Sequence, residues 1–180
     1  MRQICLKMPP PSIQTIFWCF LTIFGTACKK NSEKLPPLFD DLKSEATGVD
    51  FNNRLPEDST LNIIQYLYFY NGAGVAVGDL NNDDLPDIVF SSNIDGNKIY
   101  SNKGDFQFED QTARAGIADA GAWKTGVTLA DVNNDGWLDI YACRVSNYKG
   151  LQGKNRLFIN NHDGTFTDRA KEFGLDITGL

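Results

Sequence analysis

The chain of 180 residues is poor in histidine, cysteine and basic charge. Its single histidine provides no histidine cluster, and 17 basic against 23 acidic residues give a formal net charge of −6. This balance argues against nucleic-acid phosphates as a partner. Hydrophobic residues make up 42%, too many for a disordered tail, and no apolar run is long enough for a multipass membrane protein. The 16 glycines, set among many Asp and Asn residues, favour a β-rich repeat protein with many turns.

The first 27 residues have the pattern of an export signal. Arg2 and Lys7 precede an uncharged, mostly apolar core of twelve residues at 13–24, which is too short to span a bilayer. The segment Gly25–Cys28 resembles the lipobox at which bacterial lipoproteins are cleaved and acylated. We therefore predict cleavage before Cys28, lipidation of Cys28, and export to the outer membrane or cell surface. The alternative is an ordinary signal peptide cut nearby.

Few cysteines then remain for any disulfide. Cys5 and Cys19 leave with residues 1–27 and Cys28 carries the lipid, so only Cys143 stays a free thiol. Cys143 falls at the end of an expected strand, where we predict a buried, inert side chain.

Residues 28–60 are expected to form a tether and lead-in, followed by the aromatic run Leu61–Tyr70. This run ends at Asn71-Gly72, a turn signal, and we predict that it is a buried strand. Its aromatic side chains would also suit a carbohydrate-binding platform, but β-propensity and core packing explain them more simply.

An internal repeat organises the remaining sequence. Residues 74–90 and 126–142 share the pattern G-V-x-x-x-D-x-N-N-D-x-x-x-D-I at an offset of 52. Second blocks at 97–117 and 155–175 match at an offset of 58. The difference of six residues is an insertion in the second copy, near Ser146–Gly153. Insertions in repeats often lie on the binding face.

Each copy predicts four short strands, the size of one β-propeller blade. The fold class is therefore all-β, with a first blade over 61–122 and a second over 123–180. Known propellers have about four to eight blades, so we expect an incomplete ring. The expected strands are Val75–Gly78, Asp87–Ser91, Lys98–Ser101 and Phe106–Glu109 in the first copy, and Val127–Ala130, Asp139–Cys143, Arg156–Ile159 and Thr165–Asp168 in the second.

The loop between the first two strands of each copy carries oxygen ligands at alternate positions, as a Ca²⁺ site requires. An EF-hand begins in the same way but needs Glu at position 12, where these loops have Phe90 and Ala142. We predict about one Ca²⁺ per blade. The predicted ligands are Asp79, Asn81, Asp83, Leu85 (carbonyl) and Asp87 in the first loop, and Asp131, Asn133, Asp135, Trp137 (carbonyl) and Asp139 in the second.

At Val75–Asp87 the sequence resembles the FG-GAP or VCBS repeats of integrin-α-like β-propellers, with the pattern V-A-x-G-D-x-N-x-D-G-x-x-D. Asp84 stands where that pattern has glycine, whereas Gly136 keeps it in the second copy. The segments that follow are similar to those of bacterial lipid-anchored proteins related to cartilage acidic protein, of the ASPIC/UnbV type. This resemblance implies extracellular adhesion or recognition and no established catalysis.

Three functions remain open: a calcium-binding recognition module, a propeller enzyme acting on polysaccharide, and a scaffold subunit of an outer-membrane complex. We favour the first, which the anchor, the repeats and the acidic loops support. The enzyme is disfavoured because His162 lies in a turn sequence, 161–164, without a catalytic partner. Only copurification would distinguish the scaffold from the first. The expected partner is an extracellular protein or glycan, with membrane contact through the lipid alone and no nucleic acid. Five basic residues are scattered in the sequence and are interpreted as solvated surface: Lys103, Arg114, Lys149, Lys154 and Arg156.

Overall fold

The computed structural model describes residues 37–148 and 150–178. The chain divides into two units, residues 1–40 and 41–180, and every helix and strand named below lies in the second. The predicted signal peptide and the lipidation site at Cys28 lie outside the described residues. No helix in the described part is both long and apolar enough to cross a bilayer.

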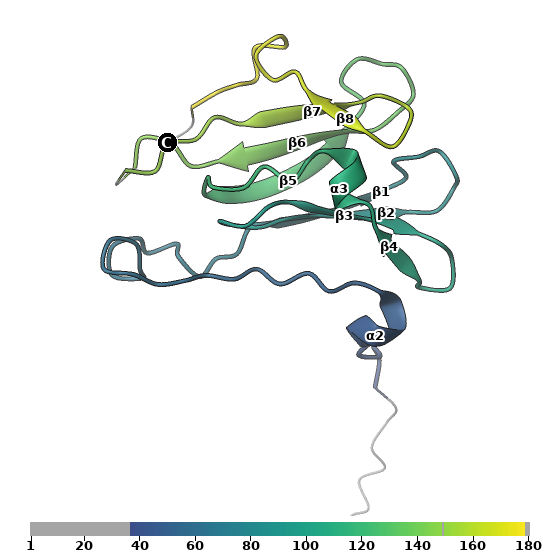
Figure 1. Cartoon of the computed structure of the whole chain (residues 1–180), viewed down its shortest axis with the longest axis horizontal. Helices are drawn as coiled ribbons and strands as arrows, with labels where there is room; N and C mark the ends of the chain where they lie inside the picture. The colour runs from purple at the N-terminus through teal and green to yellow at the C-terminus, as the bar shows by residue number, and fades with distance from the viewer. Residues whose placement is uncertain (1–36, 149, 179–180) are drawn as a thin grey trace, which may run out of the picture. The chain divides into compact units, whose positions relative to one another are not determined.

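Within residues 37–148 and 150–178, eight strands form two four-stranded antiparallel sheets, each a simple meander in which neighbours in sequence pair (Figure 1). These are the two predicted propeller-like blades, and the all-β fold class is confirmed. The first sheet comprises β1 (Gly74–Gly78), β2 (Asp87–Ser91), β3 (Lys98–Asn102) and β4 (Phe108–Asp110). The second comprises β5 (Lys124–Ala130), β6 (Asp139–Arg144), β7 (Arg156–Asn160) and β8 (Phe166–Asp168).

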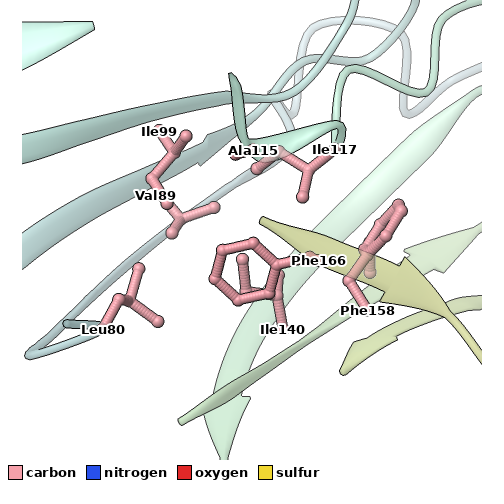
Figure 2. Close-up of a cluster of buried hydrophobic side chains, with 9 residues drawn as sticks. Leu80, Val89, Ile99, Ala115, Ile117, Ile140, Phe158 and Phe166 are labelled. Carbon is pink, nitrogen blue, oxygen red and sulfur yellow. The ribbon is translucent and has the colours of Figure 1, made fainter. Parts of the chain in front are cut away.

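The main hydrophobic core lies between the two sheets (Figure 2). Val89 of β2 and Ile99 of β3 face this core from the first sheet, while Ile140 of β6 and Phe158 of β7 face it from the second. Alternate residues of a strand point to opposite faces, so each sheet contributes every second residue to this layer. Val89 and Ile140 are completely buried, which fixes the register of both sheets, since a shift by one residue would expose them.

The described part of the chain has two short helices that were not predicted from the sequence, one before β1 and one between β4 and β5. Helix α2 (Ser44–Thr47) ends at Gly48, and α3 (Thr112–Ala115) ends at Gly116, with φ of 78° and 75°. This left-handed conformation favours glycine as a helix terminator. A Cβ on Gly48 would lie 2.4 Å from the carbonyl oxygen of Phe108, so the close approach of the lead-in to β4 also requires glycine.

The aromatic run at 61–70 is not a strand, so that prediction is wrong. The segment forms successive turns because Asn62 Oδ1 accepts the N–H groups of Ile64 and Gln65 at 3.0 and 3.1 Å. Such side-chain-to-backbone bonds compete with strand pairing. Only Tyr66 and Phe69 are buried, and both pack on Trp123. The exposed large side chains of the run include Ile64, Leu67, Tyr68 and Tyr70.

Candidate metal loops and the adjoining hollow

The two acidic loops have the same hydrogen-bond network. In the first loop, Asp79 Oδ1 accepts the N–H of Asp83 at 3.2 Å, and its Oδ2 accepts the N–H of Asp84 at 2.8 Å. In the second loop, Asp131 accepts the equivalent N–H groups of Asp135 and Gly136 at 3.1 and 2.9 Å. The first carboxylate of each loop therefore folds the loop back on itself.

Asp84 takes the backbone conformation of the glycine that it replaces. Its φ is 65°, and that of Gly136 is 86°. A non-glycine residue pays a steric cost in this left-handed region, although Asp tolerates it better than most residues. The departure from the repeat pattern at Asp84 thus leaves the turn geometry intact.

The second ligand carboxylate of each loop is the predicted position-5 ligand, Asp83 or Asp135. Asp83 Oδ1 accepts the N–H of Leu85 at 2.9 Å, and its Oδ2 accepts the Asn81 side-chain amide at 2.9 Å. Asp135 repeats both bonds with Trp137 and Asn133, at 2.9 and 2.7 Å. The position-1, -3 and -5 side chains of each loop therefore lie together.

The last carboxylate of each loop is buried and joins the loop to the sheet. Asp87 and Asp139 are each 1% exposed. Asp87 accepts N–H groups from Leu80 at 3.1 Å and Asn102 at 2.9 Å, one on each oxygen. Asp139 accepts the corresponding pair, from Val132 at 3.0 Å and Asn160 at 2.9 Å.

Burial dominates the titration of Asp87. Loss of water raises the pKa of this carboxyl, two backbone N–H donors oppose the rise, and the charges of Asp83 and Asp79 add to it. The negative charge at Asp87 is therefore held at a cost, which a bound cation would reduce.

The two loops lie side by side at one end of the sheets. The Asn82 side-chain amide donates to the carbonyl oxygen of Gly136 at 3.3 Å, and Asn160 Nδ2 donates to the carbonyl of Leu80 at 2.8 Å. Both contacts run from one copy of the repeat to the other. Sequence spacing alone could not place the loops together, because it carries no information on how the blades pack.

Sequence reasoning missed the contact that His162 makes with the second loop. His162 Nε2 lies 2.9 Å from Asp135 Oδ2, and its ring stacks on Trp137 with centroids 4.7 Å apart. The turn interpretation of His162 fits its φ of 65°, but 27 residues separate it from Asp135. A hollow of about 310 Å³ beside this pair is also lined by Lys103 and Arg114.

The donor set of each loop is chemically suited to Ca²⁺: three carboxylates, one amide oxygen and one backbone carbonyl, all oxygen. In the described part of the chain, no three histidine, cysteine or acidic side chains gather closely enough to hold a metal ion. Asp83 and Asp135 would exchange their amide partners for the ion, and the calcium ligands stay a prediction.

Comparison with known proteins identifies the class. Residues 79–142 match the model of the FG-GAP-like repeat, which begins at the first loop and extends through the second to β6. The chain thus carries FG-GAP repeat sequence, as its motifs predicted.

The individual relatives are cartilage acidic proteins. The chain is 35% identical over 91 residues to cartilage acidic protein 1 of Xenopus tropicalis, and 34% identical over 91 residues to that of Homo sapiens. Each match covers 51% of this chain and 13% of the relative. The protein of Mus musculus is 34% identical over 88 residues, again 13% of its length. The similarity therefore concerns a small part of these relatives.

Proposed function

We propose that the chain is a calcium-stabilised recognition module that is exported and held at a membrane surface by a lipid on Cys28. The observation that carries the calcium assignment is the repetition of one loop, with the same oxygen ligands and the same hydrogen bonds, in two blades. The FG-GAP match and the similarity to cartilage acidic protein 1 support an exported protein.

Calcium would act on stability by neutralising clustered carboxylates. Asp79, Asp83 and Asp87 place three negative charges in one loop of nine residues. Burial raises the pKa of Asp87 and so disfavours its charged form. A divalent cation held by these oxygens would lower that repulsion and fasten the β1–β2 hairpin. Asp131, Asp135 and Asp139 likewise place three negative charges in the loop of the β5–β6 hairpin, where a cation would lower their mutual repulsion.

We propose binding rather than catalysis. The single histidine is engaged by Asp135 and by the Trp137 ring, so its side chain supports the second loop. Cys143, the free thiol in β6, has its pKa raised by burial, which disfavours the nucleophilic thiolate.

Calcium-dependent melting of the purified chain tests the metal proposal. With a dissociation constant of about 0.1 to 1 mM per site, about 1 mM Ca²⁺ stabilises the fold by roughly 0.4 to 1.4 kcal/mol per site. The melting temperature should therefore fall when EDTA replaces Ca²⁺, and titration calorimetry should show calcium heat. Mg²⁺ should substitute poorly, because it prefers a smaller octahedral shell.

A matched pair of variants assigns the effect to the loops. Asp131→Ala should remove most of one site's share of the difference between Ca²⁺ and EDTA. Asp105→Ala, in an exposed turn outside both loops, should retain the full difference. An EDTA-insensitive wild type without calcium heat would refute the metal assignment.

The lipid anchor is tested separately in cells of a lipoprotein-processing bacterium. We expect wild-type chain to incorporate labelled palmitate and to sediment with membranes, and Cys28→Ser to lose both properties. Continued labelling of Cys28→Ser would contradict the anchor.

A further inference from the structure

A cluster of basic side chains lies at the end of the second sheet opposite to the acidic loops. Strand β6 begins at Asp139 beside its loop and ends at Arg144, and Arg156 begins the neighbouring β7. These arginines and Lys154 line one hollow of about 330 Å³, together with the polar residues Ser146, Gln152 and Thr178. The sequence positions of Lys154 and Arg156 predicted scattered basic residues. The structure instead places both in the lining of one hollow.

The two arginines of this hollow converge on one carboxylate oxygen, Oδ1 of Asp119. The Arg144 side chain is only 7% exposed and forms an ion pair with Asp119. Arg156 Nε lies 3.5 Å from the same Asp119 oxygen. Within the described part of the chain, the buried Arg144 Nε has no hydrogen-bond partner. Burial and the charge of Arg156 lower the pKa of Arg144 to about 10.

None of the residues that line this hollow is acidic. The carboxylates that pair with its cations, Asp168 with Arg156 at 2.6 Å and Asp176 with Lys154 at 2.7 Å, do not line it. The lining is thus basic or polar, while the carboxylates that pair with its three cations lie outside it. A ligand with a carboxylate or sulfate group suits such a surface.

A second hollow, of about 290 Å³, shares Arg144 with the first but is lined mainly by aromatic and uncharged residues. Its lining residues include the aromatic Tyr66, Tyr68 and Trp123 and the polar Asn71 and Thr125. Tyr66 and Trp123 are buried, whereas Tyr68 is 63% exposed. An exposed aromatic ring beside amide and hydroxyl groups suits a ligand that has an apolar face and a polar rim.

The insertion that distinguishes the second repeat connects the two hollows. Ser146 and Gln152, from the inserted segment Ser146–Gly153, line the basic hollow. Tyr148 of the same segment packs its ring 5.3 Å from that of Tyr66, beside the aromatic hollow. Loops added to one copy of a repeat often build its binding face.

We propose that this surface binds an acidic saccharide, with a sugar ring against Tyr68 and its carboxylate or sulfate at the Arg144–Lys154–Arg156 cluster. The inference rests on the proposed recognition function and assigns its ligand class. An acidic peptide would meet the basic hollow equally well, but it gives no role to the exposed Tyr68 ring. The saccharide uses both hollows.

Calorimetry with a tetrasaccharide of alternating glucuronic acid and N-acetylglucosamine tests the proposal. We expect saturable binding that weakens with salt, and much weaker binding of the neutral tetrasaccharide of N-acetylglucosamine. Lys154→Gln and Tyr68→Ala should each weaken binding by about 5- to 10-fold, corresponding to one exposed contact.

Two matched control variants test whether the effects are specific to this site or follow from the loss of any exposed lysine or aromatic ring. Lys103→Gln removes another exposed, ion-paired lysine, at the opposite end of the sheets, and should leave affinity unchanged. Tyr70→Ala removes a similarly exposed ring of the same turn. Tyr70 does not line the hollow, so this variant should also leave the affinity for the tetrasaccharide unchanged.

Three results would overturn the inference: no binding of the acidic tetrasaccharide, equal binding of the neutral one, or tighter binding of oligoglutamate that is insensitive to Tyr68→Ala. Calcium-dependent melting of the same samples separates the proposals. Where that melting persists and saccharide binding is absent, only the ligand assignment fails.

Discussion

Lys124, at the start of β5, is a fully buried lysine whose ammonium group bonds to backbone carbonyls and, among the described residues, to no carboxylate. Its Nζ donates to the carbonyl oxygens of Asp119 and Ala122, at 2.9 and 3.1 Å. Burial lowers the pKa of Lys124 to about 8, and the charge of Asp95 opposes this shift only in part. The charged form of Lys124 therefore destabilises the fold at neutral pH.

This environment predicts a rise of stability with pH. Between pH 8 and 10.5 the unfolded chain holds a proton on Lys124 that the folded chain has lost, so the free energy of unfolding increases through this range. We expect a gain of about 1 to 2 kcal/mol between pH 7.5 and 9.5 in urea unfolding. Lys124→Met should abolish the gain, whereas the exposed Lys103→Met should keep it. An equal gain in Lys124→Met would contradict the assignment.

At the same scale, the sequence predicted the residues of the acidic loops but not all of their contacts. The spacing predicted them as calcium ligands, because alternate residues of a tight loop can turn their oxygens inward, and that assignment stays a prediction. The His162–Asp135 contact depends on the pairing of β6 with β7 and on the turn after β7. Such long-range contacts have no local signal in one sequence.

Among the elements, the lead-in before the first blade packs on that blade's outer face. Asp50 accepts a hydrogen bond from the hydroxyl of the buried Tyr100 at 2.6 Å and pairs with Lys98 at 3.1 Å. Phe51 stacks on Phe90 with ring centroids 4.5 Å apart. The lead-in thus covers the side of the first sheet that faces away from the shared core.

Removal of the Phe51 ring should therefore destabilise the fold. Phe51→Ala is expected to lower the free energy of unfolding by about 1 to 3 kcal/mol, because the ring is only partly buried. Phe39→Ala, whose ring is 83% exposed, serves as the matched control and should change stability by less than about 0.5 kcal/mol. Equal effects in urea unfolding would show that the lead-in contributes no packing energy.

Strand positions were predictable to within a few residues, because the same pattern occurs twice and each strand alternates between core and outer face. The predicted Asp87–Ser91 matches β2, while β5 begins at Lys124, three residues before the expected start. The run 61–70 misled the prediction because its aromatic side chains have high β-propensity, yet Asn62 and Asp58 bind nearby backbone N–H groups and hold turns. The strand was predicted from the β-propensity of the aromatic residues, which does not take these local hydrogen bonds into account.

In the molecule as a whole, the two blades share one core and cannot bury it separately. Phe158 of β7 and Phe166 of β8 pack in the same cluster as Val89, Ile99 and Ile117 of the first copy (Figure 2). The sheets are also joined by polar contacts, since Asn93 Nδ2 donates to the carbonyl of Lys124 at 2.7 Å. Blades that depend on each other in this way should unfold as one cooperative unit.

Hydrogen exchange of the two sheets tests this cooperativity. Phe158→Leu removes part of a ring that is 5% exposed in the shared core and should cost about 1 to 2 kcal/mol. Because opening of either sheet exposes the same core, the most protected amides of β2 and β6 should lose equal free energy of opening. Phe106→Leu, at a ring that is 70% exposed, should change neither. Loss of protection confined to β5–β8 would show instead that the first sheet retains its structure when the second opens, and that each blade folds by itself.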